Sequence, residues 1–199
     1  ADALRFTLIT GNAPGNDMRF YWERVEASRN FANKIWNASR FIMMNIEKAD
    51  ITGIDAAMTA DVDAAMKQYG FTLADKWILS KMNDLVQEVT DNMEKFELGI
   101  AVSKLYDFLW EEFCDWYIEM VKPRLYSTDD AVSQNAALWT LKTVLIDALK
   151  LLHPYMPFIT EEIFCTIQNE EESIMISKWP EYSEDRAFPA EEKAIETIK

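Results

Sequence analysis

The chain has 199 residues, enough to bury a sizeable core in one or two domains, and its 49% of hydrophobic residues exclude a disordered chain. Five glycines and six prolines are few turn formers for this length, which favours long helices over many short strands. The net charge of −14 excludes a generally basic nucleic-acid binder, so any RNA contact must lie on a local patch that opposes the global charge.

The first part of the chain predicts a short helix and then a long one. Residues 1–10 have a helical pattern, and residues 12–17 have the composition of a loop. A long helix is predicted over about 21–46. The polar, alanine-rich residues 47–72 predict a connection with at most a short helix at 60–69. Both ends of the chain are helix-like, which we interpret as cuts through a longer protein.

An amphipathic helix is predicted next, over about 75–96. Asp75 is its expected N-cap, and Gly99 lies just beyond its expected end. Apolar residues recur there every three or four positions, the period of one helical face, at Ile78, Met82, Leu85, Val89, Met93 and Phe96.

Three further segments complete the predicted bundle. An aromatic-rich helix is expected over about 100–121, ending before Pro123, with a loop at 124–132. A helix over about 134–152 carries a leucine stripe, and a last bundle helix follows at about 158–168. Four long amphipathic helices with short connections predict an all-α fold, an antiparallel helical bundle.

Near the C-terminus the elements become short. Residues 174–176 are expected to form a short extended segment, and residues 181–190 a linker into a further helix.

The two sides of the predicted helix at 21–46 differ in chemistry. One stripe is expected to pack on the bundle, and it consists of Val25, Ser28, Ala32, Ile35, Ser39, Ile42 and Ile46. The opposite side carries, within about 60° of arc, the residues Asn30, Lys34, Asn37 and Phe41. These four are flanked by Arg29, Asn33 and Arg40.

Such a face suits unpaired bases. Amides can donate to and accept from base edges, an aromatic ring can stack on a base, and cations can neutralise phosphate. Residues 24–46 contain four cations against one carboxylate, a local net charge of +3. The alternative is a merely solvated face, with Phe41 covered by a neighbouring helix or loop.

Four stretches together resemble one protein family. They are Ala1–Phe6 with Gly15–Asp17, Ser28–Phe41, Phe113–Glu119 with Lys122 and Pro123, and His153–Ile163. In this order they are similar to the anticodon-binding domain of valyl-tRNA synthetases, over essentially the whole chain. The resemblance implies the helical bundle of the class I synthetase anticodon-binding type, whose matching long helix contributes to anticodon contacts.

The resemblance implies that the chain is a piece of a larger enzyme. The full enzyme attaches valine to tRNA with ATP and Mg²⁺, in the cytoplasm. The HIGH-type and KMSKS-type signatures of the full enzyme and its editing domain do not occur in this chain. The chain is therefore expected to be non-catalytic and to hold no cofactor. Its expected partners are valine tRNA and the rest of the synthetase in cis. The implied division is a junction to the catalytic core at 1–20, the anticodon-binding bundle at 21–180, and a linker with the start of the next helix at 181–199.

Other features receive structural interpretations. Cys114 and Cys165 are expected to be buried free thiols, because no metal-type spacing surrounds them. Tryptophans on apolar helices are expected to be core residues, namely Trp110, Trp116 and Trp139. A group of carboxylates is interpreted as solvated charge and not as an acid/base or metal cluster, namely Glu111, Glu112, Asp115 and Glu119.

The competing functional hypothesis is an acidic helical module that binds proteins and not RNA. The two hypotheses differ in their salt response, because RNA binding weakens steeply as salt rises. An independent enzyme is the least favoured, since the sequence shows no nucleophile positioned beside a base.

Overall fold

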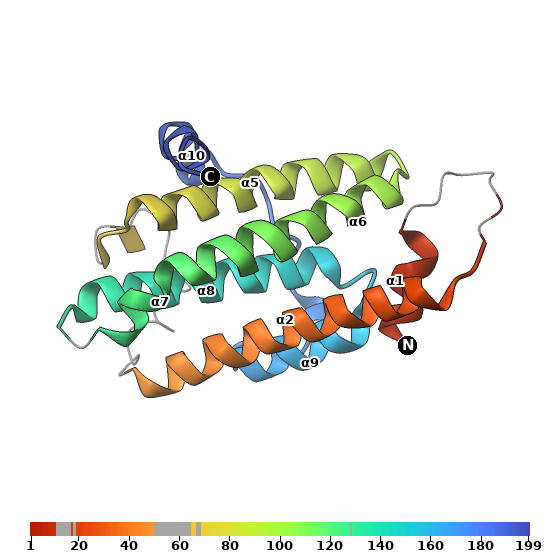
Figure 1. Ribbon diagram of the computed structural model, residues 1–199, viewed down its shortest axis with the longest axis horizontal. Helices are drawn as coiled ribbons and strands as arrows, with labels where there is room; N and C mark the ends of the chain where they lie inside the picture. The colour runs from red at the N-terminus through yellow and green to blue at the C-terminus, as the bar shows by residue number, and fades with distance from the viewer. Residues whose placement is uncertain (11–16, 18, 50–64, 67–68, 128) are drawn as a thin grey trace.

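The computed structural model describes residues 1–10, 17, 19–49, 65–66, 69–127 and 129–199. Within these residues the regular structure is helical, and no strand occurs. Helices α6 (Leu98–Asp107), η1 (Phe108–Tyr117) and α7 (Ile118–Tyr126) follow one another without a break and form one continuous rod. The bundle consists, in chain order, of α5 (Leu73–Glu94), this rod, α8 (Ala131–Leu152) and α9 (Pro157–Ile167), and each runs opposite to the one before it (Figure 1). The predicted all-α antiparallel bundle is confirmed.

Two helices precede these elements, α1 (Asp2–Ile9) and α2 (Trp22–Lys48), close to their predicted extents. Helix α2 runs in the same direction as the rod of α6, η1 and α7 (Figure 1) and packs against η1, α8 and α9. The predicted loop at 12–17 and the connection at 47–72 lie largely outside the described residues.

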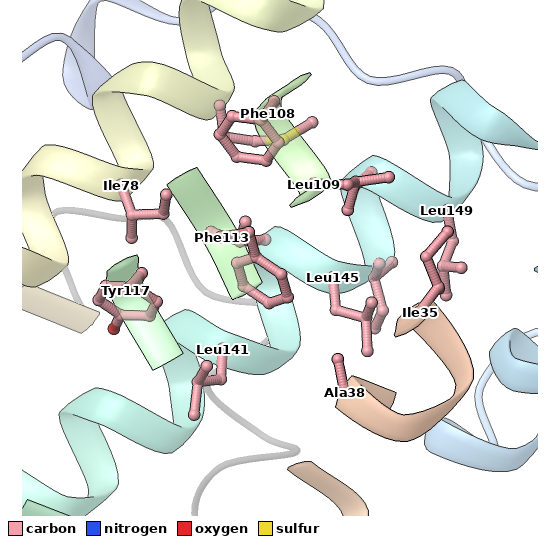
Figure 2. Close-up of a cluster of buried hydrophobic side chains, with 14 of the residues drawn as sticks. Ile35, Ala38, Ile78, Phe108, Leu109, Phe113, Tyr117, Leu141, Leu145 and Leu149 are labelled. Atoms are coloured by element: carbon pink, nitrogen blue, oxygen red, sulfur yellow. The ribbon is translucent and has the colours of Figure 1, made fainter. Parts of the chain in front are cut away.

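The core lies where α2, α5, η1 and α8 meet. Figure 2 shows Ile35 of α2, Phe113 of η1 and Leu145 of α8 converging there, and none of the three is more than 1% exposed. Helix α8 is largely buried from Ala136 to its end and is the central helix of the bundle, in contact with α2, α5, α6, α7 and α9. Its predicted leucine stripe is confirmed, because every member is at most 1% exposed: Leu138, Leu141, Leu145, Leu149 and Leu152.

An ion pair between Arg124 and a fully buried carboxylate fixes the start of α5 and corrects the predicted N-cap. Thr72 is the N-cap, and its backbone N–H donates to the carboxylate of Asp75 at 2.8 Å, which closes a capping box. Asp75 is fully buried and also accepts hydrogen bonds from Arg124, at 2.8 and 2.9 Å, and from the Tyr117 hydroxyl, at 2.7 Å. Burial raises the pKa of Tyr117 well above its ordinary value, so the hydroxyl remains a donor.

The same ion pair accounts for a second correction, at Pro123. The helix was predicted to end before this proline, but α7 continues through it to Tyr126. A proline inside a helix costs about 3 kcal/mol, because it removes one backbone hydrogen bond and crowds the preceding turn. The residues beyond it oppose this cost, since Leu125 is 5% exposed and Arg124 donates to Asp75 and to Ser133. The ten residues of η1, just before α7, form wide π-helical turns.

Helix α5 ends in a Schellman motif built on a residue other than glycine. The Phe96 N–H donates to the Met93 carbonyl at 3.0 Å, and the Glu97 N–H to the Asn92 carbonyl at 2.8 Å. Phe96 has a φ of 59° and is 83% exposed, so it is not part of the apolar face of α5. Gly99 lies inside α6 and does not follow the end of the helix as predicted.

We expect Phe96→Gly to raise the free energy of unfolding by about 0.5–1 kcal/mol. The left-handed conformation costs a non-glycine residue about 1–2 kcal/mol, and the greater freedom of glycine in the unfolded chain offsets about half of that gain. The neighbouring Lys95→Gly, at a φ of −83°, is the matched control and should lower stability. Urea unfolding of both variants is the measurement, and a less stable Phe96→Gly protein would contradict the assignment of strain.

The C-terminal segment is bound to α5. Residues 174–176 form a 3₁₀ turn, η2 (Ile174–Ile176), and not the extended segment that was predicted. After the turn η3 (Glu184–Arg186), helix α10 (Pro189–Glu196) packs on α5 (Figure 1), with Ile195 5% exposed. Ser183 and Asn83 exchange two hydrogen bonds of 2.9 Å, and the Phe188 N–H donates to Ser80 at 2.8 Å. Residues 181–190 are therefore held against the bundle.

Candidate nucleic-acid interface

The buried side of α2 is wider than predicted. Ser28, Ile35, Ser39 and Ile42 are buried as expected, and Val25, Ala32 and Ile46 are half-buried. Residues outside the predicted stripe are buried as well: Phe31, Ala38 and Asn45. Because α2 contacts several elements, it buries a broader arc than a single packing stripe would.

An aromatic ladder holds this buried side. The Phe31 ring centroid lies 5.1 Å from that of Phe6 on α1 and 4.7 Å from that of Tyr106 on α6. The Tyr106 ring in turn stacks on Trp110 at 5.5 Å. These contacts orient α2 about its own axis and thereby set which residues face solvent.

The opposite side of α2 carries exposed polar groups. Five of the seven predicted RNA-contacting residues are exposed, namely Arg29, Asn30, Asn33, Asn37 and Arg40. Among the residues that the structure describes, none forms a side-chain hydrogen bond with the three amides or an ion pair with the two arginines. These donors and acceptors are therefore available to a partner.

The other two predicted residues, Lys34 and Phe41, lie at the border of the buried arc. Lys34 Nζ is 2.6 Å from Asp115 Oδ1 and 3.8 Å from the centre of the Trp110 ring, and its side chain is 23% exposed. The Phe41 ring is partly buried against the core, and Lys122 Nζ lies 5.8 Å from its centre. The expectation that both side chains point away from the protein is met only in part, because the buried arc extends to their side of the helix.

Neighbouring elements supply the partners that spacing along α2 does not reveal. Asp115 of η1 and Glu119 of α7 are 53% and 58% exposed and pair with Lys34 and Lys122. Glu112 pairs with Lys81 at 3.4 Å. The carboxylates interpreted as solvated charge thus include counter-ions of lysines, and no group of carboxylate, histidine or cysteine side chains in the described part of the chain could hold a metal ion.

Both cysteines are free thiols, as expected, but they are not both buried. Cys114 is half-buried beside Lys34, and burial raises its pKa to about 12 against the opposing effect of the lysine charge, so it stays a neutral thiol. Cys165 is exposed on α9, so the prediction that it is buried is wrong. Its side chain faces the exposed segment around Glu172, and its sulfur lies 3.5 Å from the Glu172 carbonyl oxygen.

Of the tryptophans predicted to be core residues, Trp139 is 1% exposed and Trp110 packs against the core, whereas Trp116 is 37% exposed. Trp116 lies on the surface of η1 beneath Lys199, whose Nζ is 5.4 Å from its ring centre.

In the described ranges, no helix has both the length and the apolar character needed to cross a bilayer.

Comparison with known proteins shows the fold of this bundle and the family to which the chain belongs. The fold matches part of a crystal structure of a ternary LeuRS–tRNA–LeuAMS complex from Agrobacterium radiobacter, with a TM-score of 0.64 and 14% sequence identity, over 94% of this chain and 20% of that one. The family described as the anticodon-binding domain of tRNA ligase matches residues 75–199. The chain therefore belongs to the anticodon-binding domain family of tRNA ligases, with the fold of the class I synthetases.

Within that family, the chain is similar to valine–tRNA ligases. It is 55% identical to the valine–tRNA ligase of Clostridium tetani over 100% of its length, and 57% identical to that of Clostridium perfringens over 92%. The chain spans about a fifth of the length of these relatives, 22% and 20%. Helix α2 precedes the residues that the family matches, but the likeness to the Clostridium tetani enzyme includes it.

Proposed function

We propose that the chain binds the anticodon loop of a valine tRNA, and that the exposed side of α2 is its RNA-binding surface. The observation that carries the proposal is the set of polar groups on that side that have no partner among the described residues, on a helix whose other side is buried. Amides and guanidinium groups without protein partners are suited to base edges and phosphates. The similarity to valine–tRNA ligases supports a valine tRNA as the proposed partner.

Each of the seven predicted residues has a role in this proposal. Asn30, Asn33 and Asn37 contact the edges of unpaired bases, and Arg29 and Arg40 neutralise phosphates. The two border residues contribute at the edge of the surface, Lys34 through its ammonium group and Phe41 through the accessible part of its ring. The surrounding protein is strongly acidic, so it repels RNA elsewhere and favours binding on this local patch.

The whole protein is proposed to be a cytoplasmic valine–tRNA ligase that uses ATP and Mg²⁺. In this proposal, the segment 1–20 joins the catalytic core to the bundle at 21–180, and the segment 181–199 leads into the next element. This chain contributes tRNA binding. The aminoacylation reaction takes place in other parts of the enzyme, which correspond to the regions of its relatives that this chain does not cover. The tRNA and the rest of the synthetase chain are its partners.

Phe41→Ala should weaken binding of an anticodon stem-loop RNA from a valine tRNA by about 1–3 kcal/mol, because a base loses its stacking partner. Fluorescence anisotropy with labelled RNA measures the affinity, and urea unfolding confirms that the variant is folded at the temperature used. Phe158→Ala is the matched control, since Phe158 is a 64% exposed phenylalanine on α9. Equal affinities of the folded Phe41→Ala protein and the wild type would remove Phe41 from the surface.

A further inference from the structure

Two lysines lie along the seam where α2 meets η1 and α7: Lys34, which belongs to α2, and Lys122, which belongs to α7. We infer that Lys122 of α7 contacts the phosphate of the nucleotide whose base meets Phe41, which makes α7 a second RNA-binding element. The inference rests on the proposed function and extends it to a different helix. It follows from a repeated arrangement of ring, ammonium and carboxylate along this seam.

The seam holds two lysines in similar surroundings. Lys34 Nζ lies 3.8 Å from the centre of the Trp110 ring, and Lys122 Nζ lies 5.8 Å from the centre of the Phe41 ring. Each lysine also pairs with a carboxylate from η1 or α7, Lys34 with Asp115 and Lys122 with Glu119. In the Lys122 group the ring comes from α2 and the cation from α7, so the two helices together build the arrangement.

The exposure of these groups allows a nucleotide to reach them. The side chain of Lys122 is 35% exposed and that of Glu119 is 58% exposed. Exposed ion pairs contribute little to stability and exchange readily, so an RNA phosphate can replace the Glu119 carboxylate as the partner of Lys122. A base on the Phe41 ring brings its own phosphate close to this ring, where an ammonium group 5.8 Å from the ring centre can neutralise it.

The backbone that presents Lys122 is held firmly. Val121 is fully buried just before it, and Arg124 just after it donates to the buried Asp75 at 2.8 Å. A side chain on a rigid element keeps its position relative to a neighbouring site more accurately than one on a loop. The end of α7 therefore holds Lys122 at a fixed distance from Phe41, although Pro123 lies within this helix.

The test is Lys122→Gln, with Lys104→Gln as the matched control. Lys104 also pairs with a carboxylate, Glu88 at 2.8 Å, and has a similar exposure of 38%, but its ion pair joins α6 to α5. Affinity for the anticodon stem-loop RNA of a valine tRNA is measured over a range of salt concentrations. Loss of one phosphate contact to a single strand should lower the slope of log K against log salt by about 0.7, which corresponds to about five-fold weaker binding near 0.1 M salt.

The inference predicts this loss for Lys122→Gln and an unchanged affinity for Lys104→Gln. Equal affinities of Lys122→Gln and wild type, with weaker binding by Arg40→Gln, would overturn the inference and leave the proposed function intact. Equal losses in Lys122→Gln and Lys104→Gln would also overturn it, because net charge alone would then explain them. A wild-type chain that shows no salt-dependent RNA binding would overturn both the inference and the proposed function.

Discussion

Replacing Arg124 by methionine should lower the free energy of unfolding by about 3–5 kcal/mol, because it leaves the buried Asp75 carboxylate without its counter-ion. Asp75 is 0% exposed, and the guanidinium group supplies two of its hydrogen bonds. Arg124 also donates to Thr72 at 3.0 Å and to Ser133 at 2.8 Å, so one side chain joins the start of α5, the end of α7 and the start of α8. Its loss should loosen that whole end of the bundle.

Urea unfolding of Arg124→Met measures this effect, and the double variant Asp75→Asn with Arg124→Met is the control. Removing the carboxylate charge together with the arginine should restore part of the lost stability, since no uncompensated charge remains buried. A loss below about 1 kcal/mol for Arg124→Met would show that the pair behaves like an exposed one. That result would contradict the burial of the Asp75 carboxylate and its pairing with Arg124.

Phe31→Ala is expected to lower the free energy of unfolding by about 3–5 kcal/mol, the usual cost of deleting a buried aromatic ring. Phe31 is 1% exposed and its ring contacts those of Phe6, Tyr106 and Trp110, at centroid distances of 5.1, 4.7 and 6.4 Å. The deletion removes the contact that joins α2 to both α1 and α6. RNA affinity should fall as well wherever the variant is partly unfolded.

Trp36→Ala is the matched control for Phe31→Ala, because Trp36 is an aromatic residue of the same helix that is 37% exposed. Its loss should cost clearly less, since part of the ring is already in water. Equal losses of stability for the two variants, measured by urea unfolding, would contradict the buried position of Phe31 and the orientation of α2 that depends on it.

The extents of the helices were predictable because their apolar residues recur with the helical period over many turns. The leucine stripe of α8 and the buried residues Ile35 and Ile42 of α2 follow this period, and the structure confirms them. The position of α2 relative to η1 depends on contacts between residues far apart in the sequence, and periodicity contains no information about such contacts. Phe31 was therefore missed, although it is among the most completely buried residues of α2.

The errors at helix ends have related physical causes. Asp75 is typical of an N-cap, but its carboxylate is held by Arg124, 49 residues further along the chain. Pro123 normally ends a helix, but the packing of the residues after it maintains α7. Phe96 occupies a left-handed position that usually selects glycine, and nothing in the local pattern indicates this strain.

The polar side of α2 was predictable as a set of residues, and five of the seven are exposed. The surroundings of Lys34 were not, because Asp115 lies 81 positions away in the sequence and reaches it only through the packing of η1 on α2. The same packing places Lys122 near Phe41. The sequence therefore predicts one helix as the RNA-binding surface, whereas the structure places a lysine of a second helix at the edge of that predicted surface.

The most direct test of the proposed surface compares RNAs that differ only in the anticodon. The wild-type chain is titrated with the anticodon stem-loop of a valine tRNA and with the same stem-loop carrying a permuted anticodon, at two salt concentrations. We predict tighter binding of the valine anticodon at both concentrations, and binding of both RNAs that weakens as salt rises. Equal affinity for the two RNAs, or no binding of either, would contradict anticodon recognition by this chain.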